Sequence, residues 1–397
     1  MKAVTPRRLK AFVCRRLGLS AYLEAPGDGR VQPQIPAAAL LWSLLVGFVL
    51  REVSFQAVEA LVRSSARQAL GVARSFGNDA LAYFTERLSP EPTRQALTEV
   101  LRRAKRNKAF RQSWWIGLAV DGTGAGTSCE RSCALCHPTF NAQQEVVGHH
   151  HRLSLISVVG TGLSLPFDVE PYGRGDSEYA ASQRLLQRAV ERLGRRFADY
   201  VVADGEYATA PFLHLAGELG LRVVARLKAN LPTLLQQAQQ RFEAQPPTST
   251  FQENRDRIEV WDAEDFDPWD TLRWQSVRVL RYRQHRCDGR VIEAYWLTDF
   301  PRHLISPRQL YHMAKSRWEI ENQGFNDAKN RYGMAHTPHH HPNSLLIHWL
   351  LLVFALTLER LYRLRYLHRG GRPPYTAIEF LRLLRLSLGR PAAPDTS

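Results

Sequence analysis

Cysteine is scarce in this chain, which has five among its 397 residues. The number is odd, and three of them crowd into the stretch "SCERSCALC", at positions 129, 133 and 136. This arrangement excludes a disulfide framework of the kind that holds small secreted domains together. We therefore expect a protein of a reducing cytoplasm.

Long apolar runs are also missing. The two longest, "AAALLWSLLVGFVL" (37–50) and "LLIHWLLLVFALTL" (345–358), fall short of the roughly 20 apolar residues that a membrane-spanning helix needs. The second contains His348, and the first follows a polar segment too long for a signal peptide. We interpret both runs as buried core helices and expect no membrane role.

Acidic residues are few relative to basic ones. The 38 Asp and Glu face 53 Lys and Arg, which gives a net charge of +15. The basic residues gather in three clusters, at 1–16, 101–111 and 360–390. One such cluster is usually a solvated helix face, but three on one chain favour a polyanionic partner, nucleic acid rather than an anionic membrane.

The chain divides into four regions by composition. Residues 1–112 have helical spacing and basic character, which predicts a DNA-binding domain, with a helical cap that does not touch DNA as the alternative. Residues 113–230 alternate strand-like and helical segments, as in "WIGLAVDGTG", "ADYVVADGEYA" and "LRVVARLKAN". This pattern predicts the first part of a mixed α/β core with acids at strand ends.

The second half of the chain changes character twice. After a Gln-rich helix, residues 231–305 contain the strand-like segments "RIEVWD", "WQSVRVLRYRQ" and "RVIEAYWLTDF". These segments predict a β-rich insertion. Helical patterns return over 306–397, a region that includes the stretch "SRWEIENQGFNDAKNRYGMAH" (316–336).

Two aspartates, Asp121 and Asp204, each stand before a glycine at the end of an apolar strand-like segment. An isolated Asp-Gly pair is most often a turn. Two of them can converge at one edge of a sheet, where neighbouring strands end together. Phosphoryl transfer with two Mg²⁺ ions needs such carboxylates from separate elements.

The stretch 316–336 adds further acids in an unusual setting. Charged residues alternate there with Trp318, Ile320 and Phe325, so a helix cannot keep all its charges on one wet face. At least one carboxylate must lie at the boundary of buried surface, and we expect it to have a cationic partner.

The segments "AVDGTG" (119–124), "VVADGEYA" (201–208) and "RWEIENQGFNDAKN" (317–330) together resemble the DDE transposases of bacterial insertion sequences. The similarity is greatest to the group with a ribonuclease H-like core interrupted by a β-strand insertion. It extends from the N-terminal helices to about Arg365, and the R-W-x-I-E-N run is its most specific part.

The resemblance implies a ribonuclease H-like mixed-sheet core with a β-rich insertion, flanked by an N-terminal helical domain and C-terminal helices. It also implies Mg-dependent (or Mn-dependent) cleavage of transposon ends and joining to target DNA. The implied partner is double-stranded DNA, bound by a homodimer near the bacterial nucleoid.

Carried onto this sequence, the catalytic and Mg²⁺-binding acids are Asp121, Asp204 and Glu321. Glu319 is the competing glutamate. Arg317 favours Glu321, since the family signature has an arginine four residues before the glutamate, and residues four apart share a helix face. The alternative for this pair is a surface ion pair of little consequence.

Two positions depart from the family signature, which has a tyrosine and a lysine where this chain has Ala314 and Ala328. Tyr311 and Lys329 lie close by in the sequence. We therefore predict DNA contacts for Tyr311 and Lys329, together with Arg317 and Trp318.

The cysteine cluster is a candidate zinc site. Cys133 and Cys136 have the C-x₂-C spacing that lets two thiolates reach one ion, and Cys129, His137 or the run His149–His151 could complete the set. The alternative is a solvent-facing loop with ordinary thiols. For the His-rich loop 336–344 we favour DNA contact or a helix start at Asn343 and Ser344 over zinc.

Other functions share parts of this pattern. A metal-dependent nuclease with the same acids would cut DNA without joining it. A transposase-derived DNA-binding protein would have lost catalysis, and a zinc-dependent regulator would rely on the cysteine cluster alone. The presence of all three acids argues against the inert protein, whereas the nuclease shares these acids and the sequence does not separate it from the transposase.

Overall fold

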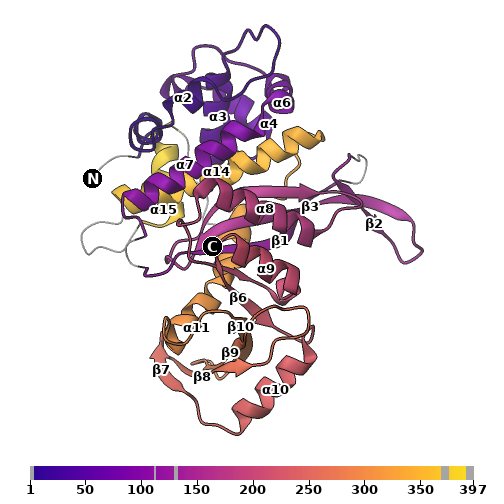
Figure 1. The fold of residues 1–397 in the computed structure, drawn as a ribbon. Coiled ribbons are helices and arrows are strands. Elements are labelled where there is room, and N and C mark those ends of the chain that lie inside the picture. Colours follow the sequence, from indigo (N-terminus) through magenta and orange to yellow (C-terminus); the bar gives the residue numbers. More distant parts are fainter. Residues whose placement is uncertain (1–3, 111–112, 129–132, 368–374, 390–397) are drawn as a thin grey trace.

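The structure is a computed structural model that describes residues 4–110, 113–128, 133–367 and 375–389. Its strands belong to a single ten-stranded sheet (Figure 1). They are β1 (Gly117–Ser128), β2 (Cys136–Phe140), β3 (Val146–Val159), β4 (Leu165–Tyr172), β5 (Tyr200–Ala203), β6 (Arg222–Leu227), β7 (Ser249–Glu253), β8 (Asp256–Phe266), β9 (Val277–His285) and β10 (Val291–Thr298).

The helices lie before, between and after the strands. The first group is α1 (Pro6–Ala11), the π-helical turn η1 (Phe12–Arg16), α2 (Ser20–Glu24), α3 (Ala37–Val49), α4 (Phe55–Arg63), α5 (Ala66–Leu70), α6 (Asn78–Arg87) and α7 (Pro90–Arg106). Among the strands lie α8 (Glu178–Leu193), the 3₁₀ turn η2 (Gly205–Tyr207), α9 (Ala210–Glu218) and α10 (Pro232–Glu243). The last group is α11 (Pro307–Lys315), α12 (Arg317–Glu319), the π-helical turn η3 (Ile320–Phe325), α13 (Asn326–Asn330), α14 (Pro342–Tyr366) and α15 (Ala377–Leu386).

The core of the sheet has the strand order of a ribonuclease H-like fold. β3 runs antiparallel to its neighbours β4 and β1, and β1, β5 and β6 run parallel. α8 and α9 make the connections between the parallel strands. The predicted mixed α/β core is therefore confirmed. The sequence analysis did not predict β2 or the start of β3 at Val146. These two strands pair to form a projecting arm (Figure 1).

The predicted β-rich segments do not form a separate sheet. β10 pairs antiparallel with β6, from Tyr295 beside Leu227 to Thr298 beside Val224. β9, β8 and β7 follow as a meander of antiparallel hairpins. The β7–β8 turn places Asn254 and Arg255 at φ of 48° and 72°, which suits the twist of a two-residue hairpin.

The helices from the two ends of the chain pack together on one side of the sheet (Figure 1). α14 is the centre of this helical body and contacts α3, α6, α7 and β4. In the described residues, α14 is the one helix long and apolar enough to cross a membrane, but 94% of its apolar window is buried inside the protein. Such burial is typical of a core helix.

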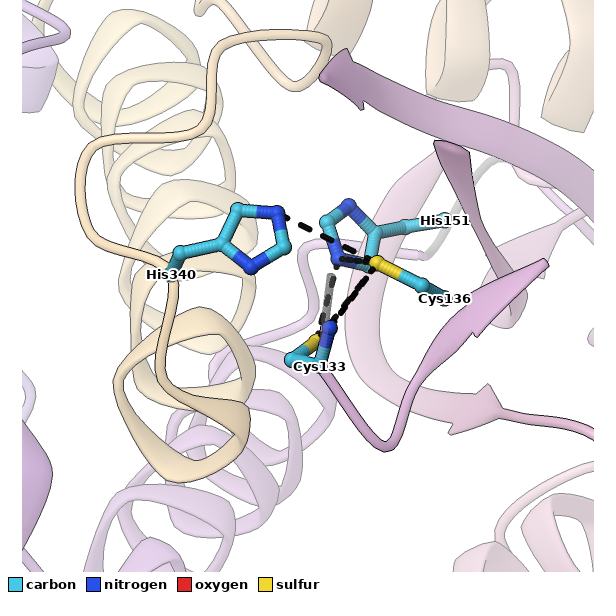
Figure 2. Close-up of side chains that lie close together, drawn as sticks. All are labelled: Cys133, Cys136, His151 and His340. Carbon is cyan, nitrogen blue, oxygen red and sulfur yellow. Dashed lines mark hydrogen bonds between the residues drawn. The ribbon is translucent and has the colours of Figure 1, made fainter. Parts of the chain in front are cut away.

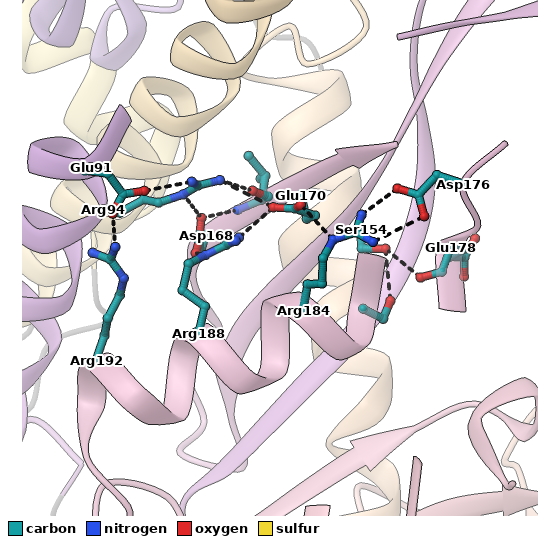
Figure 3. A network of polar contacts seen from close by, with 12 residues as sticks. Glu91, Arg94, Ser154, Asp168, Glu170, Asp176, Glu178, Arg184, Arg188 and Arg192 are labelled. Carbon is teal, nitrogen blue, oxygen red and sulfur yellow. Dashed lines mark hydrogen bonds and ion pairs between the residues drawn. The ribbon is translucent and has the colours of Figure 1, made fainter. Parts of the chain in front are cut away.

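An ion-pair network joins α7, β4 and α8 (Figure 3). Arg94 of α7 donates from Nε to Oδ1 of Asp168 at 3.0 Å, and Arg188 of α8 donates to the other oxygen at 2.8 Å. Arg94 also donates to the carbonyl of Val169. The carboxylate of Asp168 is almost fully buried, so these arginines are part of the structure and are not available to a polyanion.

Arg94→Ala should therefore destabilise the protein. We expect the free energy of unfolding to fall by about 3 kcal/mol, because the substitution leaves a buried carboxylate with half its partners. Urea denaturation measures this change. Arg184→Ala is the matched control. Arg184 belongs to the same network but is 45% exposed, so its removal should lower the free energy of unfolding by less than about 1 kcal/mol. Equal losses in the two variants would contradict the structural role of Arg94.

Candidate catalytic site

The two predicted aspartates lie on adjacent parallel strands. β1 and β5 pair in the register Gly117 to Tyr200 and Ala119 to Val202. Continued by two residues, this register aligns Asp121 with Asp204, which directly follows β5. The fold thus brings the two Asp-Gly pairs to one edge of the core, as the sequence predicts.

Glu321 lies on a helical segment with a local distortion. α11, α12, η3 and α13 follow one another from Pro307 to Asn330, and η3 is a π-helical turn that contains Glu321. Such turns interrupt the regular α-helical ladder and are frequent at functional sites. Arg317 NH1 lies 2.8 Å from Oε1 of Glu321 and 3.5 Å from Oδ2 of Asp121.

The opposite side of this π-helical turn is fixed to the turn between β3 and β4. Glu319 accepts a hydrogen bond from the amide of Gly160 at 3.0 Å, and Gln323 accepts one from the amide of Ser164 at 3.2 Å. Arg360 of α14 donates to the carbonyls of Ser164 and Gln323. Glu319 therefore faces away from Asp121, while Glu321 faces toward it.

Asp204 has a cationic partner of its own. Lys228, one residue beyond β6, donates to Oδ2 of Asp204 at 2.6 Å. Burial alone would raise the pKa of Asp204, but the hydrogen bonds from Lys228 and the Gly205 amide outweigh burial and lower it. The charge of Arg317 acts in the same direction. Arg317 thus contacts Asp121 and Glu321, and its charge also acts on Asp204.

Asp121 carries the strongest electrostatic strain of the three. Burial raises the pKa of its carboxyl group to about 7, against the favourable charge of Arg317. The negative charges of Glu321 and Glu178 raise this pKa further. A divalent cation relieves such repulsion, and carboxylate oxygens are the ligands that Mg²⁺ prefers. The donor set therefore fits a divalent metal ion.

The structure adds Glu178 to the site, a residue that the sequence analysis did not single out. It lies in the first turn of α8, and its carboxylate accepts hydrogen bonds from the hydroxyls of Tyr207 at 3.0 Å and Tyr172 at 3.3 Å. A Cβ atom at Gly122 would lie 1.9 Å from this carboxyl group. The glycine after Asp121 leaves room for the Glu178 carboxylate. The requirement for a glycine at this position was the signal in the sequence that pointed to a neighbouring side chain.

Comparison with known protein families agrees with this geometry. The family described as "Transposase DDE domain" matches residues 117–358, more than half of the chain. The chain belongs to this transposase family. No curated protein sequence matches it.

Among solved structures, the chain is similar to a piggyBac transposase in a synaptic complex with hairpin DNA. The two are 11% identical, and the alignment covers 98% of this chain and 80% of that one, with a TM-score of 0.48. The assignment to the transposase family rests on the family match and not on this similarity.

The residues of this transposase-family chain for which we predicted DNA contacts differ in how deeply they are buried. Tyr311 is fully buried and donates to Glu253 of the insertion at 3.3 Å. This burial contradicts the predicted DNA contact through Tyr311, because its hydroxyl is directed into the protein. Tyr311 is close in sequence to the signature position, Ala314, but it lies on the face of α11 that packs against β9 and the ring of Tyr282.

Trp318 and Lys329 remain close to the surface. The ring of Trp318 packs edge-on against Trp296 and has Lys315 over its face at 4.9 Å and Arg226 at 5.9 Å. Lys329 is half-buried, and burial lowers its pKa. Their predicted DNA contacts stay predictions.

The structure gathers four potential metal ligands at the base of the β2–β3 arm (Figure 2). They are Cys133, Cys136, His151 and His340. Burial lowers the pKa of His151 to about 4, so its imidazole is neutral at pH 7.

The structure bears on two expectations about this cluster. His137 lies outside the group, because its Nε2 is 2.9 Å from the carbonyl of Tyr172 and must donate to it. The His-rich loop 336–344 leads into a helix as we expected, since α14 begins at Pro342, and His340 of this loop also has its Nε2 3.9 Å from the sulfur of Cys136. Cys129 lies outside the described residues. Only the folded chain brings position 340 to the C-x₂-C segment.

The raised pKa of Asp121 predicts a stabilising substitution. In metal-free protein the folded chain holds the Asp121 proton up to about pH 7, whereas the unfolded chain releases it near pH 3.8. The contribution of Asp121 therefore lowers the free energy of unfolding as pH rises from about 4 to 7. Above pH 7 this contribution no longer changes with pH. Asp121→Asn should raise the free energy of unfolding at pH 8 by about 2–4 kcal/mol, measured by urea denaturation in EDTA.

Asp204→Asn is the matched comparison with the opposite sign. The pKa of Asp204 is lowered, so its stabilising contribution exists above its unfolded pKa and disappears as pH falls through the folded value. This variant should be less stable at pH 8, by about 1 kcal/mol at most, since Lys228 is 48% exposed. A loss of stability in Asp121→Asn would show that burial does not strain Asp121.

Proposed function

We propose that this chain is a DNA transposase that cleaves transposon ends and joins them to target DNA by metal-dependent phosphoryl transfer. The observation that carries the proposal is the position of Asp121 and Asp204 at the ends of adjacent parallel strands, with Arg317 beside Asp121 and Glu321. These acids come from two adjacent strand ends and a separate helical segment, which is the arrangement that two-metal chemistry requires.

Asp121, Asp204 and Glu321 are the residues that would hold Mg²⁺ or Mn²⁺. When bound, such ions activate the attacking water or 3′-hydroxyl and stabilise the charge that develops on the leaving oxygen. The exposure of the carboxylates increases from 17% at Asp121 to 41% at Glu321. The site is therefore open on the side of Glu321, which suits a substrate as large as a duplex.

The basic residues around the acids have a role in substrate binding. Lys228 and Arg317 neutralise Asp204, Asp121 and Glu321 in the protein alone. Their positions beside the acids suit contact with the phosphates that flank the reacting bond, since phosphate contacts fix the register of a protein on DNA. The mechanism needs no covalent protein intermediate.

Double-stranded DNA is the partner that the charge favours, but the three basic clusters contribute differently. Arg7 and Arg15 of the first cluster are exposed. In the third cluster, Arg360 is buried against Asp327, and Arg363 pairs with Glu359. We assign non-specific DNA binding to the first cluster and to the site itself, in a homodimer that holds two ends together.

Cleavage of end DNA tests the catalytic assignment. With Mg²⁺ and a labelled duplex that carries the terminal sequences flanking the gene, Asp121→Asn, Asp204→Asn and Glu321→Gln should each lower the cleavage rate at least about 100-fold. Loss of one metal ligand removes several kcal/mol of transition-state stabilisation. Glu319→Gln should keep most activity, since Glu319 is bonded to Gly160.

Glu206→Gln is the control for substitution near the site, because Glu206 is exposed two residues beyond Asp204. Strand-transfer products with a target plasmid distinguish a transposase from a nuclease that only cuts. Full activity in Glu321→Gln with an inactive Glu319→Gln would overturn the choice of glutamate. DNA binding without cleavage in wild type would favour an inert, transposase-derived DNA-binding protein.

A further inference from the structure

A second group of chemically reactive side chains lies apart from the three acids, at the base of the β2–β3 arm (Figure 2). Cys133 and Cys136 come from the turn that leads into β2, and His151 comes from β3. His340 comes from the loop before α14, 204 residues along the chain from Cys136. Three separate segments therefore contribute to one cluster.

The distances among Cys133, Cys136 and His151 match a tetrahedral zinc site, and Nε2 of His340 lies 3.9 Å from the sulfur of Cys136. Zn–S bonds of about 2.3 Å and Zn–N bonds of about 2.05 Å at tetrahedral angles place two sulfurs about 3.8 Å apart and sulfur and nitrogen about 3.5 Å apart. The sulfurs of Cys133 and Cys136 are 3.8 Å apart. Nε2 of His151 is 3.4 Å from each sulfur, and all four ligand atoms lie within 4.8 Å of one another.

The surroundings also suit a bound metal ion. The amide of Cys133 is 3.3 Å from the sulfur of Cys136 and donates to it, and a hydrogen bond of this kind stabilises a thiolate. Cys136 and His151 are buried, and Trp349 of α14 packs against the His151 ring. With four protein ligands, the group leaves no open coordination position for catalysis.

We propose that Cys133, Cys136, His151 and His340 bind one structural zinc ion that fixes the β2–β3 arm to the loop following the Glu321 segment. The same loop already contacts β1. A Cβ atom at Gly126 would lie 2.6 Å from Oγ1 of Thr337 and 3.1 Å from the carbonyl of Ala335. The ion would thus hold the β2–β3 arm to the chain that follows Glu321, beside the contact that this chain makes with the strand that carries Asp121.

The metal content of the full-length protein tests this proposal. Protein produced with added zinc and then desalted should contain about one zinc per chain, measured by mass spectrometry of the metal. Cys133→Ser and His340→Ala should lower zinc affinity at least about 100-fold, since each removes a direct ligand. Replacement of the metal by Co²⁺ should give the intense visible absorption of a tetrahedral thiolate site.

Matched variants separate loss of a ligand from loss of the fold. His340→Cys supplies another ligand atom and should retain the metal while strengthening the thiolate-to-cobalt absorption. Cys287→Ser, at an exposed cysteine of the β9–β10 turn, and His137→Ala, beside the cluster but outside it, should retain zinc.

Thiol reactivity gives a second readout. Cys133 and Cys136 should react slowly with a thiol reagent until a chelator removes the ion, after which both should react. Protein without zinc, in which both thiols react at once, would overturn the proposal. Zinc loss in His137→Ala or Cys129→Ser, but not in His340→Ala, would overturn this ligand set. Neither result depends on DNA cleavage.

Discussion

The concentration of negative charge at one edge of the sheet is the constraint on which the site depends. Burial makes the charge on Asp121 costly, and the nearby negative charge of Glu321 adds to that cost. Arg317 offsets both from within the protein by contacting Asp121 and Glu321, and its charge also acts on Asp204.

The helical segment that carries Arg317 and Glu321 is held on its opposite side by hydrogen bonds that involve side chains. Its π-helical turn disrupts the regular backbone hydrogen bonds, and Arg360 of α14 donates to the carbonyl of Gln323 within it. Glu319 is bonded to the β3–β4 turn. The central helix of the helical body thereby fixes the direction of Glu321. The packing of the terminal helices therefore also positions a candidate site residue at the edge of the sheet.

Arginine has two distinct uses in this chain, and composition does not separate them. Arg94 and Arg188 are largely buried in ion pairs that join α7 and α8 to β4, and Arg360 is buried in an ion pair that joins α14 to α13. Others, such as Arg7 and Arg15, are exposed. A net charge of +15 therefore overstates the surface available to DNA. The same distinction applies to cysteine, since Cys133 and Cys136 lie in the four-ligand cluster while Cys287 is exposed.

The sequence by itself determined the strand and helix pattern of the core, because apolar periodicity and turn residues are local. It also offered three candidate acids, because Asp-Gly pairs at strand ends are a local signal for Asp121 and Asp204, and the resemblance to the family signature favoured Glu321 through Arg317. Only the tertiary structure decided the burial of Tyr311, the place of Glu178 beside Gly122, and the meeting of His340 with Cys136. These contacts join residues 56 to 204 positions apart, or depend on which helix face packs inward, and no local pattern records them.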